Sequence, residues 1–208
     1  MMKVFGHPAS TCTRKVLCTL AEKASPFEFV VVDITKGEQR SPEHLARQPF
    51  GVVPALDDDG FALYESRAIV RYLDATLPGV SLTPADAKAR ALMEQWISVE
   101  HSYFSPHAMK AVLNIWYASM QGKEPDGEVV AKGLADSTRA LDVLEKNLAG
   151  KDYLVGTFSL ADISYAPYLQ YLEDMRINAI VTERPNVLAW WKRVSARPAW
   201  QKAIGKGA

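Results

Sequence analysis

Every segment with strand character lies in the first 64 residues of this 208-residue chain. Apolar and β-branched runs occur at Lys3 to Phe5, at Phe27 to Val32 and on both sides of the Asp59-Gly60 step. From residue 86 onward, apolar residues recur only at helical spacing. The sequence therefore predicts a mixed α/β unit followed by an all-helical unit.

The first unit is predicted to have the element order β-α-β-α-β-β-α. Helical periodicity covers about Thr11 to Lys23 and Ser66 to Leu77, and Ser41-Pro42 is typical of an N-cap followed by proline at the first helical position. Asp59-Gly60 predicts a tight hairpin between the last two strands. A change of composition at Leu77-Pro78-Gly79 places the end of this domain at residue 78.

The second domain is predicted to span residues 86–208 and to contain only helices. Helical patterns cover about residues 87–120, 128–148, 160–174 and 187–196, with glycine and proline between them. Ser159 to Asp162 resembles a capping box, a local signal for the start of a helix.

Composition narrows the classes of partner. The 24 basic and 24 acidic residues balance, which disfavours nucleic-acid binding, and the sequence has no long apolar stretch typical of a membrane span. Cys12 and Cys18 lie about 9 Å apart on one helix, too far for a disulfide, so we expect a reducing, cytoplasmic setting. The four histidines show no metal-ligand spacing, and we expect no metal.

Three short motifs are candidates for a ligand site. Ser10 lies at a helix start, where its hydroxyl can donate to an anion such as a thiolate or can simply cap the helix. Val53-Pro54, if the peptide bond is cis, can present the Val53 backbone to an extended peptide; alternatively, Pro54 is an ordinary strand-edge residue. Glu65-Ser66 can bind the ammonium and carboxylate of an amino-acid group, or can serve only as a helix cap.

Two further sets of residues have an open interpretation. Cys12, in the first turn of the first helix, is either a nucleophile or a passive thiol. Aromatic and apolar side chains of the long helix are mostly core candidates, and a subset is predicted to line an apolar substrate site: Phe104, Met109, Val112 and Trp116.

Three motifs occur in the same order as in a known family. Residues 3–10 (KVFGHPAS), residues 47–56 (RQPFGVVPAL) and residues 65–69 (ESRAI) resemble cytosolic glutathione transferases, most closely the phi class. The helix start at Ser159 to Asp162 is also similar to the family's motif, so the resemblance covers both halves of the chain.

The resemblance implies a thioredoxin-like N-terminal domain, an all-helical C-terminal domain and a homodimer into whose partner subunit Phe50 packs. Glutathione is then the co-substrate. The roles implied are thiolate stabilisation by Ser10, backbone pairing by Val53 beside cis-Pro54, and binding of the γ-glutamyl end by Glu65 and Ser66, with Arg67 in the same motif.

Two positions depart from the family pattern. Gln39 stands where the family usually has histidine near the glycine carboxylate, and Val52 stands where it usually has glutamine. Gln39 retains a hydrogen-bond donor and Arg40 can supply positive charge to that carboxylate.

The sequence thus favours a glutathione transferase in which the thiolate attacks an electrophilic, apolar second substrate, as in detoxification. Two alternatives stay open: a glutathione-dependent thiol oxidoreductase that uses Cys12, and a non-catalytic glutathione-binding scaffold.

Overall fold

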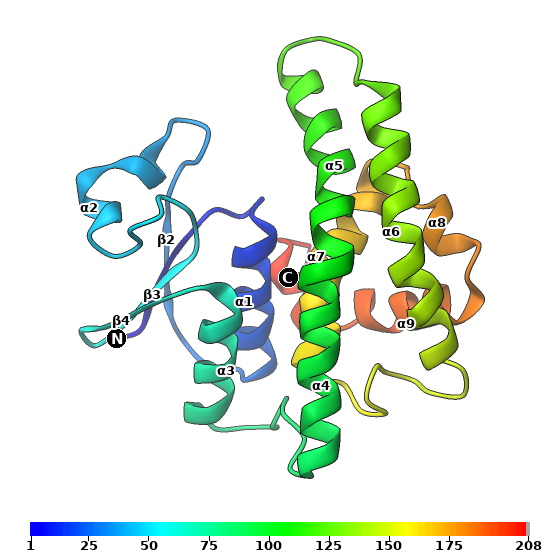
Figure 1. Cartoon of the computed structure of the whole chain (residues 1–208). Helices are drawn as coiled ribbons and strands as arrows, with labels where there is room; N and C mark the ends of the chain where they lie inside the picture. Colours follow the sequence, from blue (N-terminus) through cyan, green and yellow to red (C-terminus); the bar gives the residue numbers. More distant parts are fainter. Residues whose placement is uncertain (207–208) are drawn as a thin grey trace. The chain divides into compact units, whose positions relative to one another are not determined.

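The computed structural model describes residues 1–206 and divides the chain into two compact units (Figure 1). One unit comprises Met1–Thr83 with the C-terminal segment from Arg197 onward, and the other comprises Pro84–Ala196. The helical domain was predicted to extend from residue 86 to the chain end, whereas the C-terminal segment groups with the first unit.

Helix α10 (Pro198–Ala203) packs against α1 (Thr11–Glu22) within the first unit. Trp200 is fully buried there, and Arg197 forms a two-point ion pair with Glu22, with Nε–Oε1 and Nη2–Oε2 distances of 2.7 and 2.8 Å. The sequence pattern does not predict α10, because a helix of six residues is too short to show apolar periodicity.

The first unit contains a mixed four-stranded sheet and confirms the predicted β-α-β-α-β-β-α order. The spatial order is β2-β1-β3-β4, with β1 parallel to β2 and antiparallel to β3, and with β3 antiparallel to β4. The strands are β1 (Lys3–Gly6), β2 (Glu28–Val31), β3 (Ala55–Asp58) and β4 (Phe61–Tyr64); the remaining helices are α2 (Pro42–Leu45) and α3 (Ser66–Thr76).

Helices α1 and α3 pack together on one face of this sheet, and α2 lies on the other (Figure 1). On the second face, Phe5 and Ala55 form a small core with Val32, and the Arg47 guanidinium lies 4.3 Å from the centre of the Phe5 ring. Because side chains alternate along a strand, neighbouring buried residues such as Val4 point to the face that α1 and α3 cover.

The predicted Asp-Gly hairpin is confirmed. Asp59 and Gly60 both have positive φ, 49° and 94°, which is the geometry of the two-residue turn that matches the twist of the flanking strands. The Gly60 N–H donates to the Asp57 carboxylate at 2.8 Å.

A buried ion pair connects the C-terminal ends of α1 and α3. Lys23 Nζ donates to Asp74 Oδ1 at 2.9 Å and to the Val80 carbonyl at 3.1 Å, and the two side chains are almost inaccessible to solvent. Asp74 Oδ1 also accepts the Leu82 N–H at 2.8 Å, so this one carboxylate fixes the segment that follows α3.

The second unit is all-helical, as predicted. Its elements are α4 (Ala87–Val99), a π-helical turn (Glu100–Phe104), α5 (Ser105–Met120), α6 (Gly127–Asn147), α7 (Leu160–Asp174), α8 (Ala179–Thr182) and α9 (Pro185–Ser195). The pattern at residues 87–120 predicts one continuous helix; the π-helical turn lies just before Pro106, which cannot donate to the α-helical ladder. Among the described residues, no helix is long and apolar enough to span a bilayer.

The capping box predicted at Ser159 is confirmed at the start of α7, the most buried helix of this unit. Asp162 accepts the N–H and hydroxyl of Ser159 at 2.9 and 3.0 Å, the Leu154 N–H at 3.1 Å and Trp190 Nε1–H at 2.8 Å. Burial raises the pKa of the Asp162 carboxyl, and these four hydrogen bonds oppose that effect.

The buried pair gives a test of the first unit. Asp74→Asn removes the charge that compensates buried Lys23, so we expect the free energy of unfolding at pH 7 to fall by about 3–5 kcal/mol. Urea denaturation measures it. The matched control is Glu43→Gln, because Glu43 pairs with Arg47 at the surface and its loss should cost less than about 1 kcal/mol. Equal effects of the two substitutions would contradict the assignment.

The same pair predicts an acid dependence of stability. Burial raises the pKa of Asp74, but hydrogen bonds from Leu82, Thr83 and Lys23 outweigh it, and the net pKa is lowered. A lowered carboxyl pKa stabilises the fold above the unfolded pKa of about 3.9, and this stabilisation is lost as pH falls through the folded value. We expect Asp74→Asn to flatten the acid limb of a stability-against-pH curve.

Candidate functional site

The register of the sheet brings the candidate ligand-binding segments to one edge. Gly6, at the end of β1, pairs with Val31 at the end of β2, and its neighbour Phe5 pairs with Ala55 at the start of β3. Ala55 in turn pairs with Tyr64 at the end of β4. The segments that carry Ser10, Gln39, Val53 and Glu65 are therefore all connected to the sheet at the same end.

Ser10 is the N-cap of α1. Its Oγ accepts the Thr13 N–H at 3.2 Å, and its own N–H donates to the His7 carbonyl at 2.9 Å. The side chain is half-buried, and among the described residues no protein group accepts its hydroxyl proton. One hydroxyl can thus cap the helix through its lone pair and still donate to an anion.

The turn before Ser10 is fixed by close packing between β1 and α1. His7 N–H donates to Thr13 Oγ1 at 3.3 Å, and His7 Nδ1 accepts the Ala9 N–H at 3.2 Å. A Cβ on Gly6 would lie 2.6 Å from Thr13 Cγ2, so only glycine permits this approach. The position of Ser10 therefore depends on Gly6 and on fully buried Thr13.

The Val53-Pro54 peptide bond is cis. Val53 precedes β3 and is partly buried against the Phe5 core cluster. In the described chain, neither its N–H nor its C=O is hydrogen-bonded to another protein group. Because an unpaired backbone donor and acceptor at a strand start match the edge of an extended peptide, this is a template for strand addition.

Gln39 and Arg40 lie in the 3-10 turn Glu38–Arg40, which begins after Gly37 in the left-handed conformation. The Glu38 carboxylate accepts the Asp33 N–H at 2.7 Å. The hydrogen bond that the Thr35 hydroxyl donates to the Asp33 carboxylate lowers the pKa of Asp33 to about 2. A Cβ on Gly51 would lie 3.4 Å from the Gln39 carbonyl, so this turn lies against the loop that leads to Val53. Gln39 is half-buried and Arg40 is exposed.

Glu65, Ser66 and Arg67 open α3. Glu65 is exposed and has a positive φ of 69°, a rare backbone conformation for a residue other than glycine. Because Ser66 is the first residue of the helix, its N–H has no intrahelical acceptor, and no side chain caps the helix. The Ser66 side chain is buried. A helix start with this geometry favours an anion such as a carboxylate.

The two cysteines are both free, which confirms the expectation that no disulfide joins them. Cys18 is fully buried, and burial raises the pKa of its thiol well above the ordinary range, so it is inert. Cys12 is half-buried in the first turn of α1, two residues after Ser10.

The four apolar candidates of the helical unit differ in exposure. Phe104 is fully buried, with its ring 5.4 Å from Tyr165 and 6.2 Å from Tyr168, and Val112 is buried as well. Met109 and Trp116 are half-buried and can contact a ligand. Of the predicted set, the structure therefore brings Phe104 and Val112 into the core of the unit.

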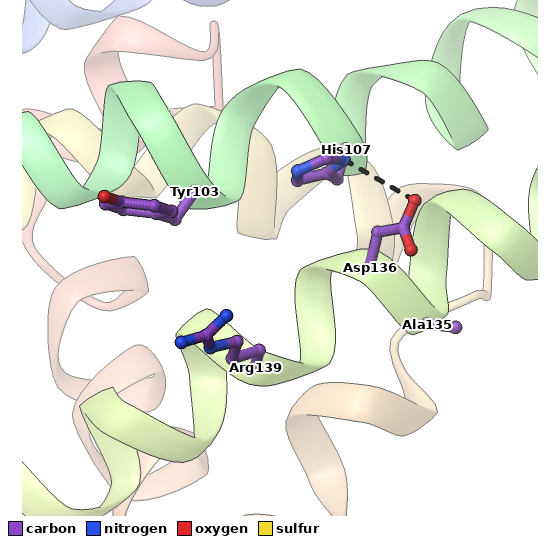
Figure 2. A pocket seen from close by; sticks show the side chains of 5 residues that line it. All are labelled: Tyr103, His107, Ala135, Asp136 and Arg139. Atoms are coloured by element: carbon purple, nitrogen blue, oxygen red, sulfur yellow. Dashed lines mark ion pairs between the residues drawn. The ribbon is translucent and has the colours of Figure 1, made fainter.

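A cavity of about 410 Å³ lies between α5, the π-helical turn before it, and α6 (Figure 2). The lining residues are Tyr103, His107, Ala135, Asp136 and Arg139. His107 Nδ1 lies 3.7 Å from Asp136 Oδ2, which Lys132 Nζ also approaches at 3.1 Å. No pattern in the sequence identifies these residues as a group, because only the contact between two helices places them together.

Gly133 sets the spacing of the two helices beside this cavity. A Cβ on Gly133 would lie 2.9 Å from the His107 carbonyl and 3.0 Å from the Ala111 nitrogen. The helices therefore approach closely at this glycine. A glycine within a helical pattern is the one sequence signal that could have located this contact.

Comparison with known proteins covers both units. The model of the glutathione S-transferase N-terminal domain matches residues 1–75, and that of the C-terminal domain matches residues 101–198. Glutathione S-transferase F11 of Arabidopsis thaliana is 39% identical over an alignment of 208 positions, which covers 98% of this chain and 97% of the relative.

Solved structures agree with these matches. Glutathione transferase F7 from Populus trichocarpa is 36% identical, with a TM-score of 0.93 over 100% of both chains. Glutathione S-transferase I from maize, in complex with an atrazine glutathione conjugate, is 32% identical, with a TM-score of 0.89 over 99% of this chain and 97% of that one. The resemblance and the fold class inferred from the sequence are confirmed.

The contact between β1 and α1 predicts the effect of one methyl group. Gly6→Ala places a Cβ against Thr13, and we expect a loss of about 1–3 kcal/mol in the free energy of unfolding from overpacking. Adding Thr13→Ala removes the two clashing atoms, so the double variant should be more stable than the sum of the single effects predicts. Additive effects in urea denaturation would contradict this account.

Proposed function

This chain belongs to the glutathione S-transferase family, and on that premise we propose that Ser10 holds the sulfur of bound glutathione as a thiolate. The thiol proton leaves to solvent, and the sulfur lone pair forms a carbon–sulfur bond with an electrophilic carbon of an apolar second substrate. The electron pair of the broken bond departs with the leaving group, or moves to the adjacent atom when the electrophile is a double bond. No redox change occurs.

The observation that supports this role most directly is the hydrogen bonding of Ser10. Its Oγ is already an acceptor for the Thr13 N–H, which leaves the hydroxyl proton for a ligand. A thiol with a pKa near 8.5 needs about 1.4 kcal/mol of differential stabilisation for each unit by which its pKa falls. One charge-assisted hydrogen bond, aided by the helix N-terminus, is of that size.

The proposed position of glutathione follows from the unengaged groups at this edge of the sheet. Its cysteinyl backbone pairs with the N–H and C=O of Val53 beside cis-Pro54. Glu65 and Ser66 bind the ammonium and carboxylate of the γ-glutamyl group, and Arg67 lies in the same turn. Gln39 and Arg40 face the glycine carboxylate. The short separation of Gly51 from Gln39 supports this grouping.

The second substrate is proposed to be a small apolar electrophile, as in detoxification. Two predicted residues of the helical unit, Met109 and Trp116, retain exposed apolar surface, whereas Phe104 and Val112 are buried in the core of this unit. The maize relative was solved in complex with an atrazine glutathione conjugate, which supports an electrophile as the second substrate. Free Cys12 and Cys18 support a cytoplasmic, reducing location.

We also propose a homodimer in which Phe50 is an anchor. Phe50 is 72% exposed, yet its backbone is held rigidly, because its N–H donates to Oε1 of buried Gln48 at 2.7 Å. Its ring packs edge to face with the Tyr64 ring, with 6.0 Å between the two ring centres. A large aromatic side chain on a fixed backbone loses little conformational entropy on binding, which is typical of an interface hot spot.

The cavity of the helical unit is a suitable receptor for this anchor on a second copy of the chain. Its volume exceeds that of a phenyl ring, Tyr103 supplies an aromatic surface, and the Arg139 guanidinium can lie over a ring (Figure 2). The exposed ring of Tyr64, which contacts Phe50, extends the apolar surface around this anchor.

The catalytic role of Ser10 is tested by two substitutions. Ser10→Ala and Ser10→Gly both remove the hydroxyl, and we expect each to lower kcat/KM about 10- to 100-fold, the worth of one hydrogen bond to a charged group. Glycine caps helices nearly as well as serine, so Ser10→Gly separates catalysis from helix stability. Turnover with a chromogenic electrophile and the ultraviolet absorbance of bound thiolate against pH are the two measurements.

The Cys12→Ala variant is the matched control. Retained activity in Cys12→Ala supports the transferase assignment, whereas loss of turnover in Cys12→Ala alone would establish the oxidoreductase alternative. Glutathione binding without a thiolate band in the unsubstituted protein would establish the scaffold alternative.

The anchor is tested by oligomeric state. Phe50→Ser should raise the dimer dissociation constant at least about 30-fold, as expected for a hot-spot aromatic residue. Sedimentation velocity across a concentration series measures this constant. Val80→Ser is the control, because Val80 is equally exposed and lies outside the proposed interface. A monomeric unsubstituted protein, or an unchanged constant in Phe50→Ser, would refute the proposal.

A further inference from the structure

We propose that His44 is a positioning residue for glutathione, because it fixes the peptide plane that presents the Val53 N–H. The inference rests on the proposed function and adds a residue to the same site. His44 does not contact the proposed ligand, since only 3% of its surface is exposed. It acts through a hydrogen bond to the residue before Val53.

The imidazole of His44 lies against the Val52 backbone. Its Nε2 is 2.7 Å from the Val52 carbonyl oxygen, a short distance for a nitrogen–oxygen hydrogen bond. The carbonyl can only accept, so Nε2 carries the proton. Because His44 is buried, this bond shows that the Val52 carbonyl points inward, whereas the Val52 side chain is half-exposed.

The planar peptide bond relates the direction of the Val52 carbonyl to the direction of the Val53 N–H. The Val52 carbonyl and the Val53 N–H belong to one planar peptide unit, and in a trans unit the two groups point in opposite directions. Among the described residues, the only cis peptide bond is Val53-Pro54, so the Val52-Val53 bond is trans. Holding the Val52 oxygen on His44 therefore turns the Val53 N–H away from the interior, toward the position of the ligand.

Individual hydrogen bonds, not regular secondary structure, fix this loop. Residues 46–54 contain no strand or helix, so the direction of each carbonyl depends on individual bonds. Gln48 binds the Phe50 N–H at one end, and His44 binds the Val52 carbonyl at the other. Without His44, the peptide unit between Val52 and Val53 can rotate, and the Val53 N–H loses its preorganised direction.

His44 is itself well anchored. It lies in α2, where the Ser41 hydroxyl caps the helix by accepting the His44 N–H at 3.2 Å and Pro42 occupies the first turn. Its Nδ1 is buried, and no group in the described part of the chain hydrogen-bonds to it. A proton on Nδ1 would leave a buried donor without an acceptor, so the Nε2–H tautomer is the form that fits this site.

The test compares donors of different reach. His44→Phe keeps the ring volume and removes the donor, and we expect the dissociation constant for glutathione to rise about tenfold. His44→Gln carries an amide N–H₂ near the position of Nε2 and should restore most of the affinity. His44→Asn has a shorter amide that stops short of the Val52 carbonyl, and it should resemble His44→Phe. Calorimetric titration with glutathione measures all four proteins.

A control variant shows whether loss of stability alone changes glutathione affinity. The Asp126→Ala variant removes the N-cap of α6 in the other unit, where Asp126 accepts two backbone N–H groups, so it lowers stability without touching this loop. We expect unchanged glutathione affinity in that control. In steady-state kinetics, His44→Phe should raise KM for glutathione while kcat at saturating glutathione changes less than threefold.

A second measurement uses the unsubstituted protein, so it does not depend on whether a variant folds. The ¹⁵N chemical shifts of the His44 ring in the unsubstituted protein should show a proton on Nε2 and none on Nδ1. Equal glutathione affinity in His44→Phe and the unsubstituted protein, or a dominant Nδ1–H tautomer, would overturn this inference alone. Absence of glutathione binding by the unsubstituted protein would overturn the proposed function and this inference with it.

Discussion

The register of the four-stranded sheet is the constraint on which the candidate site depends. Because β1 runs parallel to β2 and antiparallel to β3, the end of β1 and the start of β3 lie at one edge, and β4 returns to the same edge. Changing the register by one residue would turn every side chain to the opposite face. Phe5 would then leave its cluster with Val32 and Ala55, so the same apolar contacts that stabilise the sheet also assemble the site.

Three serine residues at helix starts show how tertiary context separates capping from chemistry. Ser159 is fully buried, and its hydroxyl both donates to Asp162 and accepts the Ala161 N–H. Ser41 accepts from His44 and fixes a helix that carries no proposed ligand contact. Ser10 accepts from Thr13 but lies half-exposed at the edge of the candidate site, with its hydroxyl proton available. The residue type is the same, and only the surroundings make Ser10 a candidate for thiolate binding.

The two units contribute different kinds of chemistry. The first holds backbone donors and acceptors at Val53, a helix start at Ser66 and a hydroxyl at Ser10, which suit a small polar peptide. The second is organised around α7 and its buried Asp162 network, and it offers a cavity flanked by Arg139 and Tyr103. Buried ionic and polar groups, Asp74 in one unit and Asp162 in the other, connect loops to helices where apolar packing alone would leave them loose.

Much of this organisation is encoded locally and was predictable from the order of residues. Periodicity, the Asp59-Gly60 turn and the Ser159 capping box depend on neighbours within a few positions, so the element order and most helix starts followed from sequence. Ser10, Val53 and Glu65 were identifiable because each lies at the end of a predicted element. Their proximity, by contrast, was a hypothesis from residue types and from the resemblance, because no local pattern places the three segments at one edge.

Contacts between distant residues were decided by the tertiary structure alone. The return of α10 to the first unit, the His44 bond to Val52 and the cavity near Gly133 each join groups whose separation along the chain carries no periodic signal. Burial of Phe104 and Val112 likewise depends on which neighbouring helices cover them. A sequence determines its local elements through short-range geometry, whereas exposure, hydrogen-bond partners and cavities exist only after those elements have packed.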